Sequence, residues 1–463
     1  MNDASKTQLF EEMPVPRAVV KLAVPTTISC LVMVLYNLAD TYFVGMLNDP
    51  VQNAAVTLAA PVLLAFNAVN NLFGVGGSSM MSRALGKKDD ETVYRSSAFG
   101  FYSALFSGIL FAIACTVFKD PLLALLGTDS YNLSDTAAYM FWTVSCGAAP
   151  AILNVVMGYL VRAEGSALHA SIGTMSGCVL NIILDPVFIL PWGLNMGAAG
   201  AGCATFISNC VACGYFFVLL YVKRKRTYVC INPKYLGFRR EIVLGVCGVG
   251  IPAAIQNLLN VTGMTVLNNF TAEYASDAVA AMGISQKLNM IPMNIAMGLS
   301  QGIMPLISYN YAAKNHERMK KTLVFAAKLT VGFLGITSLG YYLGAEGLVS
   351  LFMKNDAVVG YGARFMRGLC LATPFLATDF LAVGVFQACG MGKKSLVFAV
   401  MRKIVLEIPA LYILNALFPL YGLAYAQFTA EIILAAAALF VLARMFRGFA
   451  SAGREPGERV DGV

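Results

Sequence analysis

The sequence has few charged residues. Asp, Glu, Lys and Arg make up 13% of its 463 residues, about half of what a soluble globular domain carries. Hydrophobic residues make up 58%, and apolar runs long enough to cross a bilayer recur along the whole chain. This composition excludes a soluble globular protein and predicts an all-α integral membrane protein, since a helix satisfies its backbone hydrogen bonds within one spanning segment.

Histidine is also scarce, with two in the whole chain, and the eleven cysteines are scattered mostly through apolar segments. Cys210 and Cys213 form a Cys-x-x-Cys pair inside a hydrophobic run, without the neighbouring pattern of a redox or zinc site. We therefore expect no disulfide framework, no zinc centre and no thiol chemistry.

A phosphate-binding loop of the GxxxxGK[ST] type is absent, so ATP hydrolysis by this chain is not expected. Gly74-Val75-Gly76-Gly77 is too short and too apolar to be such a loop. We predict a protein that is not an enzyme and has no cofactor. Its driving force should come from an ion gradient, with H⁺ or Na⁺ as coupling ion, or from a partner.

The apolar runs predict twelve membrane-spanning helices at the usual length of about 20 residues for each span. The expected ranges are 17–46, 51–82, 93–118, 132–161, 167–190, 197–222, 240–270, 277–311, 319–344, 357–388, 395–415 and 421–446. Several exceed the bilayer thickness and should tilt, bend or project beyond it.

Basic residues gather in alternate connections between these runs, which predicts the orientation because cytoplasmic loops retain Lys and Arg. Both termini should then be cytoplasmic. The net charge of +8 is explained by this topology, so no nucleic-acid partner is expected. Residues 1–16 are polar and do not resemble a signal peptide, so the first helix should be retained.

The basic connection at 223–239 lies close to the middle of the chain and divides it into two similar halves. Ala23-Val24-Pro25 in the first half matches Gly250-Ile251-Pro252 in the second, and other short matches follow at nearly the same offset. We expect an N-terminal lobe at 1–222, a C-terminal lobe at 240–447 and a disordered cytoplasmic tail at 448–463. With six helices each, the lobes should be two pseudo-symmetric bundles related by an axis along the membrane normal, enclosing a cavity.

Asp40 is a carboxylate within the first predicted span. An ionised Asp at bilayer depth costs a few kcal/mol even on lenient insertion scales, so such residues usually face an internal cavity. Tyr36 and Asn37 precede it by four and three residues and lie on the same helical face. A structural carboxylate that bonds a neighbouring helix is the alternative interpretation.

The fifth predicted helix repeats this pattern with Asn181 and Asp185, one helical turn apart and followed by Pro186. Two carboxylates with amide neighbours can share a proton or bind a small hard cation through oxygen atoms. Asn154 and Thr205 are candidates to complete such an oxygen-lined pocket, although hydrogen bonding between helices explains them equally well.

The second half lacks this carboxylate pair, because Met264 and Leu267 stand where Asn37 and Asp40 stand in the first half. We predict an asymmetric protein with its coupling site in the N-terminal lobe. Further candidates for the substrate cavity are polar or adaptable residues of the second half: Gln256, Met290, Met293 and Asp379. For the methionines, ordinary packing is the favoured alternative, and Glu407 is expected to be structural.

Several short motifs together resemble the multidrug and toxic compound extrusion (MATE) family, in particular its DinF-like and MepA-like bacterial branch. They are Pro25 with Asn37-x-x-Asp40-x-x-x-Val44-Gly45, Arg83-Ala84-Leu85-Gly86, Arg162-x-Glu164-Gly165, Asn181-x-x-x-Asp185-Pro186, and Gly200-Ala201-x-x-Ala204-Thr205. The resemblance extends over roughly residues 10–447.

The resemblance implies a secondary active exporter that alternates between outward-open and inward-open states and confers antibiotic resistance. It would exchange cationic amphipathic drugs for H⁺ or Na⁺, with Asp40, Asn181, Asp185 and Thr205 as the ion site and Asn154 nearby. The same four residues would bind Na⁺ if sodium is the coupling ion. Pro25 would serve as the conformational hinge, and the protein would act as a monomer among the lipids of a bacterial inner membrane.

One position departs from the family pattern. Relatives with a cation site in the C-terminal lobe carry Glu in the seventh helix, where this chain has Val261. This difference argues against a second sodium site.

Two other functions are compatible with parts of the pattern. A lipid-linked oligosaccharide flippase of the same superfamily would need a strongly cationic cavity, formed for example by Lys287, Arg364 and Arg367. An intramembrane aspartyl hydrolase would use Asp40 and Asp185 as an acid and base, but the repeated architecture favours transport.

Overall fold

The computed structural model describes residues 8–452, with side chains described through residue 449. Its elements begin with Gln8–Glu12 (η1), Val15–Gly45 (α2), Pro50–Asn70 (α3), Asn71–Val75 (η2), Gly76–Gly86 (α4), Asp90–Val117 (α5), Lys119–Leu125 (α6), Leu133–Met140 (α7), Phe141–Cys146 (η3), Ala148–Ala163 (α8), Ala167–Ile189 (α9) and Gly197–Val222 (α10). The second half contains Pro233–Tyr235 (η4), Arg240–Ala272 (α11), Ser276–Ala312 (α12), His316–Ser350 (α13), Asp356–Ala388 (α14), Gly392–Val400 (α15), Met401–Glu407 (η5), Ile408–Leu417 (α16) and Gly422–Ala452 (α17).

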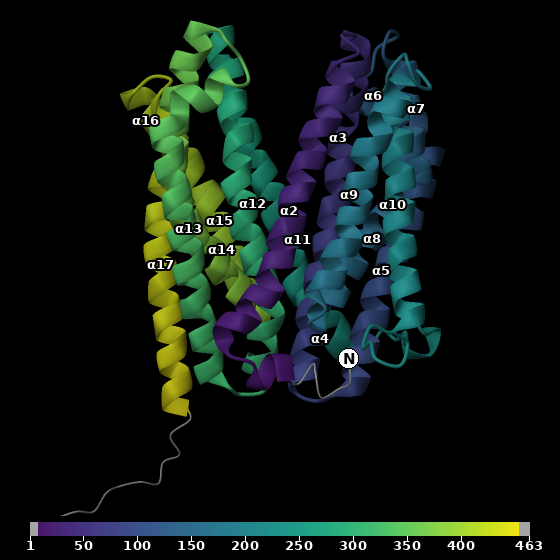
Figure 1. Ribbon diagram of the computed structural model, residues 1–463, viewed down its shortest axis with the longest axis vertical. Coiled ribbons are helices and arrows are strands. Elements are labelled where there is room, and N and C mark those ends of the chain that lie inside the picture. Colours follow the sequence, from purple (N-terminus) through teal and green to yellow (C-terminus); the bar gives the residue numbers. More distant parts are fainter. Residues whose placement is uncertain (1–7, 453–463) are drawn as a thin grey trace, which may run out of the picture.

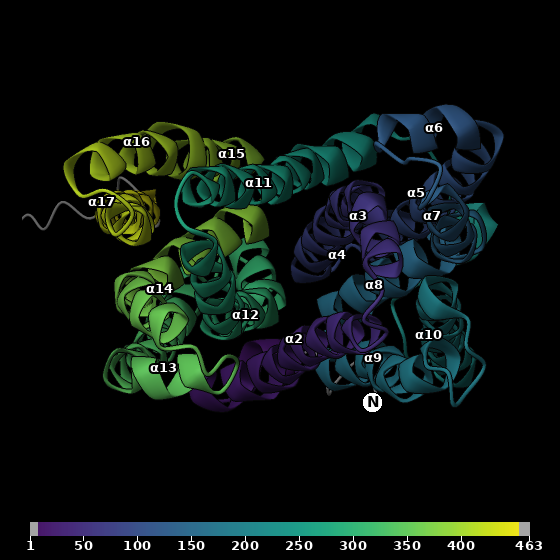
Figure 2. The same ribbon diagram turned by 90° about the horizontal axis from the view of Figure 1, so that it is seen from above.

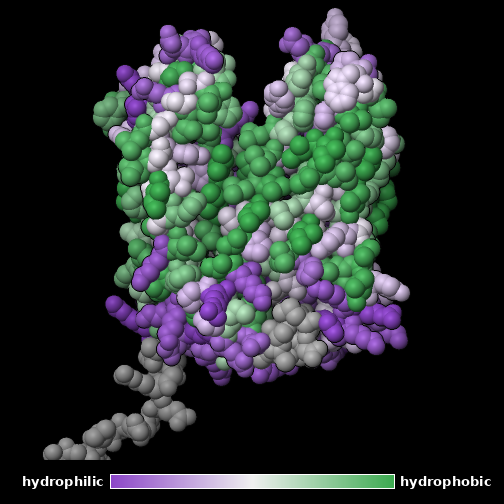
Figure 3. All heavy atoms as spheres, in the orientation of Figure 1, coloured by the Kyte–Doolittle hydropathy of each residue, from purple (hydrophilic) through white to green (hydrophobic). Residues whose placement is uncertain are grey.

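The helices form two upright groups, α3 to α10 on one side and α12 to α17 on the other (Figure 1). The long helices α2 and α11 occupy equivalent places in the two halves and lie on opposite sides of the molecule, each bridging the two groups (Figure 2). This arrangement agrees with the predicted pair of related bundles. Hydrophobic residues cover the middle of the visible face, between polar residues at its two ends (Figure 3).

Ten of the described helices are long and apolar enough to span a membrane, and there are eleven if the pair formed by Leu133–Cys146 and Ala148–Ala163, bent by 49°, is counted as one span. The remaining predicted span, 395–415, corresponds to the continuous segment from α15 through η5 to α16. Its central residues Arg402, Lys403 and Glu407 are charged, and all three are buried. The segment thus differs from an ordinary apolar span because its charges face other helices rather than lipid.

One end of the molecule is rich in Lys and Arg, and we call it the basic end. It contains the turn from α4 to α5, the connection 223–239 and the turn from α12 to α13. The two halves meet there and diverge toward the opposite end (Figure 1). The space-filling view shows a deep notch at that opposite end (Figure 3). The structure is therefore open at one end and closed at the basic end.

Short polar contacts hold the basic end closed. The Ser79 hydroxyl of α4 donates to the carbonyl of Gln387 in α14, at 2.5 Å. The N-terminal element η1 lies across the same end, where Glu11 accepts a hydrogen bond from Tyr309 at 2.6 Å and lies 3.5 Å from Lys88. Glu11 thus connects side chains that belong to the two halves.

The tail was expected to be disordered from residue 448, but α17 continues to Ala452. The reason is aromatic packing, since Phe449 stacks on His316 with ring centroids 4.3 Å apart. That contact ties the end of α17 to α13. The remaining tail, 453–463, lies outside the described residues.

One helix contact yields a stability prediction. Gly250 of α11 lies so close to the carbonyl of Leu72 that an added methyl group would overlap it, whereas Gly248 has open space at the same point. Gly250→Ala should therefore lower the free energy of unfolding by about 1–3 kcal/mol through overpacking. Thermal unfolding in detergent should show a lower Tm for Gly250→Ala and no loss for Gly248→Ala. Equal Tm values for the two variants would contradict this close approach.

Candidate ion and substrate site

Three helices bring the predicted polar residues of the first half together. Asn181 and Asp185 are one turn apart on α9 and are buried, and Thr205 faces them from α10. In the amide orientation that satisfies its neighbours, Asn181 donates to the two Asp185 carboxylate oxygens at 2.8 and 3.2 Å. Its own oxygen accepts from the Thr205 hydroxyl and backbone N–H at 3.2 and 3.1 Å.

Asp40 approaches this group from α2. Its carboxylate interacts electrostatically with Asp185, and its Oδ1 is buried with no hydrogen-bond partner among the described residues. Tyr36, one turn earlier on α2, interacts with both Asp40 and Thr205. The two acids therefore belong to one polar cluster, in which an unsatisfied carboxylate oxygen is available to a proton or a cation.

The side-chain atoms of Asp40, Asp185 and Thr205 that could bind an ion are oxygens, which suit a proton or a hard cation. Within residues 8–452, no three His, Cys, Asp or Glu side chains gather as a metal site. In the arrangement described, Asn181 presents its NH₂ group to Asp185. Asn181 would therefore have to rotate its amide before its oxygen could join Asp185 around a sodium ion.

A cavity of about 350 Å³, which we call the N-lobe chamber, adjoins this cluster and is lined by Tyr36, Asn181 and Thr205 among others. Asn154 also lines it but donates to Asn209 at 2.8 Å rather than to either acid. Asn154 therefore lies on the chamber wall, and its amide is engaged in a hydrogen bond between α8 and α10.

The other candidates for the substrate cavity lie outside this chamber. Asn37 is exposed and donates to the carbonyl of Met33, and Gln256 accepts from Gln387 at 3.2 Å. Met290 and Met293 are half-buried on α12 but do not line the chamber, whereas Met297, further along the helix, does.

Asp379 is enclosed in the C-terminal half. It is 1% exposed and lies 3.6 Å from Arg402, which also donates to Glu431 at 2.6 Å. Next to this triad, Lys403 and Glu407 form a buried ion pair at 2.7 Å. Asp379 does not line the N-lobe chamber, and its environment is a closed charge cluster rather than a substrate wall.

Pro25 lies in the interior of α2, which continues unbroken from Val15 to Gly45. Asp40 is on the same helix, fifteen residues further along. Any change in the bend of α2 at Pro25 would therefore move Asp40 relative to α9.

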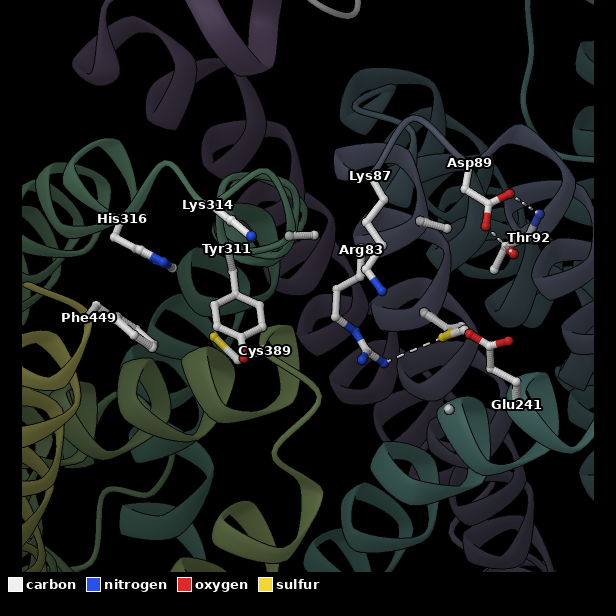
Figure 4. Close-up of a pocket in the computed structure, with 14 residues that line it drawn as sticks. Arg83, Lys87, Asp89, Thr92, Glu241, Tyr311, Lys314, His316, Cys389 and Phe449 are labelled. Carbon is white, nitrogen blue, oxygen red and sulfur yellow. Dashed lines mark hydrogen bonds between the residues drawn. The ribbon is translucent and has the colours of Figure 1, made fainter. Parts of the chain in front are cut away.

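A second cavity, of about 740 Å³, lies at the basic end between α4 and the turn from α12 to α13 (Figure 4). Arg83 points into it, with Tyr311 and Cys389 opposite, and donates weakly to the Met80 sulfur at 3.7 Å. This cavity shares no lining residue with the N-lobe chamber.

The basic residues required for a flippase do not gather in a cavity. Lys287 is exposed on α12, Arg367 pairs with Glu346 at 3.1 Å, and Arg364 lies over the ring of Tyr421. None of these basic residues lines the N-lobe chamber or the cavity at the basic end. The strongly cationic cavity that a lipid-linked oligosaccharide flippase would need is therefore not found among the described residues.

Several lining residues were not selected from the sequence. They include Asn70, Arg162, Asn257 and Gln301. The helical spacing could have indicated one of them, because Arg162 follows Asn154 by eight residues, about two turns along the same side of α8. Asn257 and Gln301 come from the second half, and their proximity to the chamber depends on packing between the halves.

Two related halves of membrane-spanning helices, with ionisable residues beside an internal chamber, define the architecture of a secondary transporter. The MatE family model matches residues 25–187 and 252–413, one match in each half. The chain belongs to the MATE family of transporters.

The multidrug export protein MepA of Staphylococcus saprophyticus is 33% identical over 437 residues, 94% of each chain. MepA of Staphylococcus aureus strain MRSA252 is 33% identical over 436 residues, again 94% of each chain. A multidrug resistance MATE transporter in an outward-facing conformation has a TM-score of 0.91 at 24% identity, covering 97% of this chain and 100% of its own. A MATE protein in complex with MaD3S also gives 0.91, at 25% identity and with the same coverage.

Proposed function

We propose that this protein is a multidrug exporter that expels amphipathic organic cations in exchange for H⁺ or Na⁺. The observation that carries the proposal is the shared wall between the N-lobe chamber and the acid cluster. Tyr36, Asn181 and Thr205 line the chamber and also contact or neighbour Asp40 and Asp185. The names of the MepA relatives support the drug substrates.

The proposed mechanism is competition between ion and drug. A ligand shifts a conformational equilibrium only by its different affinity for the two states, so the ion must bind the outward-open and inward-open forms unequally. Ion binding at Asp40 and Asp185 would alter the packing of α2 against α9, with Pro25 as the hinge. The chamber would then release its drug.

We further propose that the protein resides in the bacterial cytoplasmic membrane with both termini in the cytoplasm. The concentration of Lys and Arg at the basic end supports this orientation. The notch in Figure 3 would then open outward, in agreement with an outward-open state.

The proposal is tested with purified protein in lipid vesicles loaded with a fluorescent cation. An imposed pH gradient and, in a separate experiment, an imposed sodium gradient are applied at equal membrane potential. At least one gradient should accelerate efflux over protein-free vesicles, and the gradient that does so identifies the ion. Efflux that depends on neither gradient would contradict exchange.

A further inference from the structure

Arg162 is a buried arginine without an anionic partner. Its side chain lies on α8, is 7% exposed and lines the N-lobe chamber. No carboxylate of the described residues lies within ion-pair distance, and its Nε has no hydrogen-bond partner there. Its guanidinium lies over the ring of Tyr159, 5.5 Å from the centroid, and interacts electrostatically with the Cys30 thiol, which is not an anionic partner at neutral pH.

An isolated buried charge is unfavourable unless something compensates for it. Arg402, which is buried to a similar extent, shows the usual solution, since Glu431 and Asp379 both face it. A single cation–π contact compensates Arg162 only in part. The guanidinium of Arg162 is therefore available for a ligand in the chamber, and its planar fork can bind a carboxylate through two parallel hydrogen bonds.

The chamber also has two chemically different ends. Arg162 is the one charged side chain among the described residues that line it. Arg162 is one residue from the end of α8, whereas Asn181 lies fourteen residues into α9, about 21 Å from the start of that helix along its axis. Tyr36, Asn181 and Thr205 line the chamber beside Asp40 and Asp185. A ligand that fills the chamber would thus meet a positive charge at one end and two acids behind the other.

We propose that Arg162 binds the carboxylate of amphipathic zwitterionic substrates, whose protonated amine then lies toward the wall formed by Tyr36, Asn181 and Thr205. This proposal rests on the export function proposed above and narrows its substrate class. Arg162 acts as a specificity residue, since it selects for an acid group that a simple organic cation lacks. Apolar contacts along the chamber would hold the rest of the molecule.

The test compares a dye with a free carboxylate, rhodamine 110, with its methyl ester, rhodamine 123. The two differ in that one acid group, so the ester is a cation and the acid a zwitterion. Efflux of each is measured in the same vesicles for the wild type, Arg162→Met and Arg162→Lys. Arg364→Met serves as the matched control, because Arg364 is exposed on α14 and lies outside the chamber.

For Arg162→Met, kcat/KM for the free acid should fall about 10- to 100-fold, the range of a charge-assisted hydrogen-bonded contact. The ester should stay within about twofold of wild type, because it makes no such contact. Arg162→Lys should retain part of the preference for the acid, and Arg364→Met should transport both dyes normally.

Other outcomes would overturn the assignment. Equal losses of kcat/KM for both dyes would show that Arg162 has a structural role. Unchanged efflux of both dyes would show that Arg162 does not take part in substrate recognition. A wild type that exports the ester but not the acid would also contradict the proposal, while leaving cation export intact. Failure of the proposed export function itself would be distinguishable, because neither dye would then move under any gradient.

Discussion

Asp185→Asn and Asp40→Asn are expected to reduce drug efflux by about 5- to 150-fold, the range of a typical coupling free energy between two ligands. Asn has nearly the size of Asp but can neither take up a proton nor supply a carboxylate to a cation. The ion would then bind both conformations equally and could no longer shift the equilibrium between them. Efflux of a fluorescent cation from vesicles, at matched protein content, measures the effect.

The folded protein should survive both changes. Neither carboxylate forms an ion pair with the described residues, Asp40 has an unpartnered oxygen, and an Asn at position 185 keeps one oxygen that can accept a hydrogen bond from Asn181. Asp120→Asn is the matched control, since Asp120 is exposed at the start of α6. Wild-type efflux by either cluster variant at equal expression would exclude that acid from coupling.

The sequence predicted the composition of this cluster because its signals are local. Asn181 and Asp185 are one turn apart on one helix, and so are Tyr36 and Asp40. A polar side chain inside an apolar run is conspicuous on its own. The hydrogen bonds of Asn181, which decide what it offers to an ion, depend on Thr205 from a different helix and required the structure.

The C-terminal half was harder to predict because its polar residues are paired over long distances. Lys403 and Glu407 are four residues apart, and their pairing follows from helical geometry. Arg402 and Glu431 are separated by 29 residues and meet through the packing of η5 against α17. Asp379 therefore looked like a substrate residue, whereas its contacts are those of a buried ion cluster.

Most helix limits agreed with hydropathy to within a few residues, although α13 extends to Ser350, six residues beyond the predicted end. Larger differences occur where the chain carries buried charge or π-helical turns. The predicted span 395–415 is divided into α15, η5 and α16, and the predicted span 51–82 into α3, η2 and α4. A π-helical turn changes the backbone register without changing mean hydropathy, so periodicity alone does not reveal it. Such turns often occur at functional sites, and η2 directly follows Asn70, a residue of the chamber wall.

Arg402→Met is expected to destabilise the C-terminal half by about 3–5 kcal/mol, because it leaves buried carboxylates without their partner. The change removes the guanidinium from between Asp379 and Glu431, which are 1% and 0% exposed. Thermal unfolding in detergent and the yield of folded protein should both fall sharply. Arg447→Met, a change at an exposed position of α17, should have little effect.

A triple variant separates a structural role of this cluster from a role in transport. Asp379→Leu and Glu431→Met, added to Arg402→Met, replace the three charges by apolar side chains of comparable size, an exchange that is often neutral or stabilising. The triple variant should regain most of the stability lost in Arg402→Met and should also export the fluorescent cation, because these residues bind each other rather than a substrate. A stable triple variant without efflux would instead make Asp379 or Glu431 part of the transport machinery, and the C-terminal half would then contribute an ionisable site of its own.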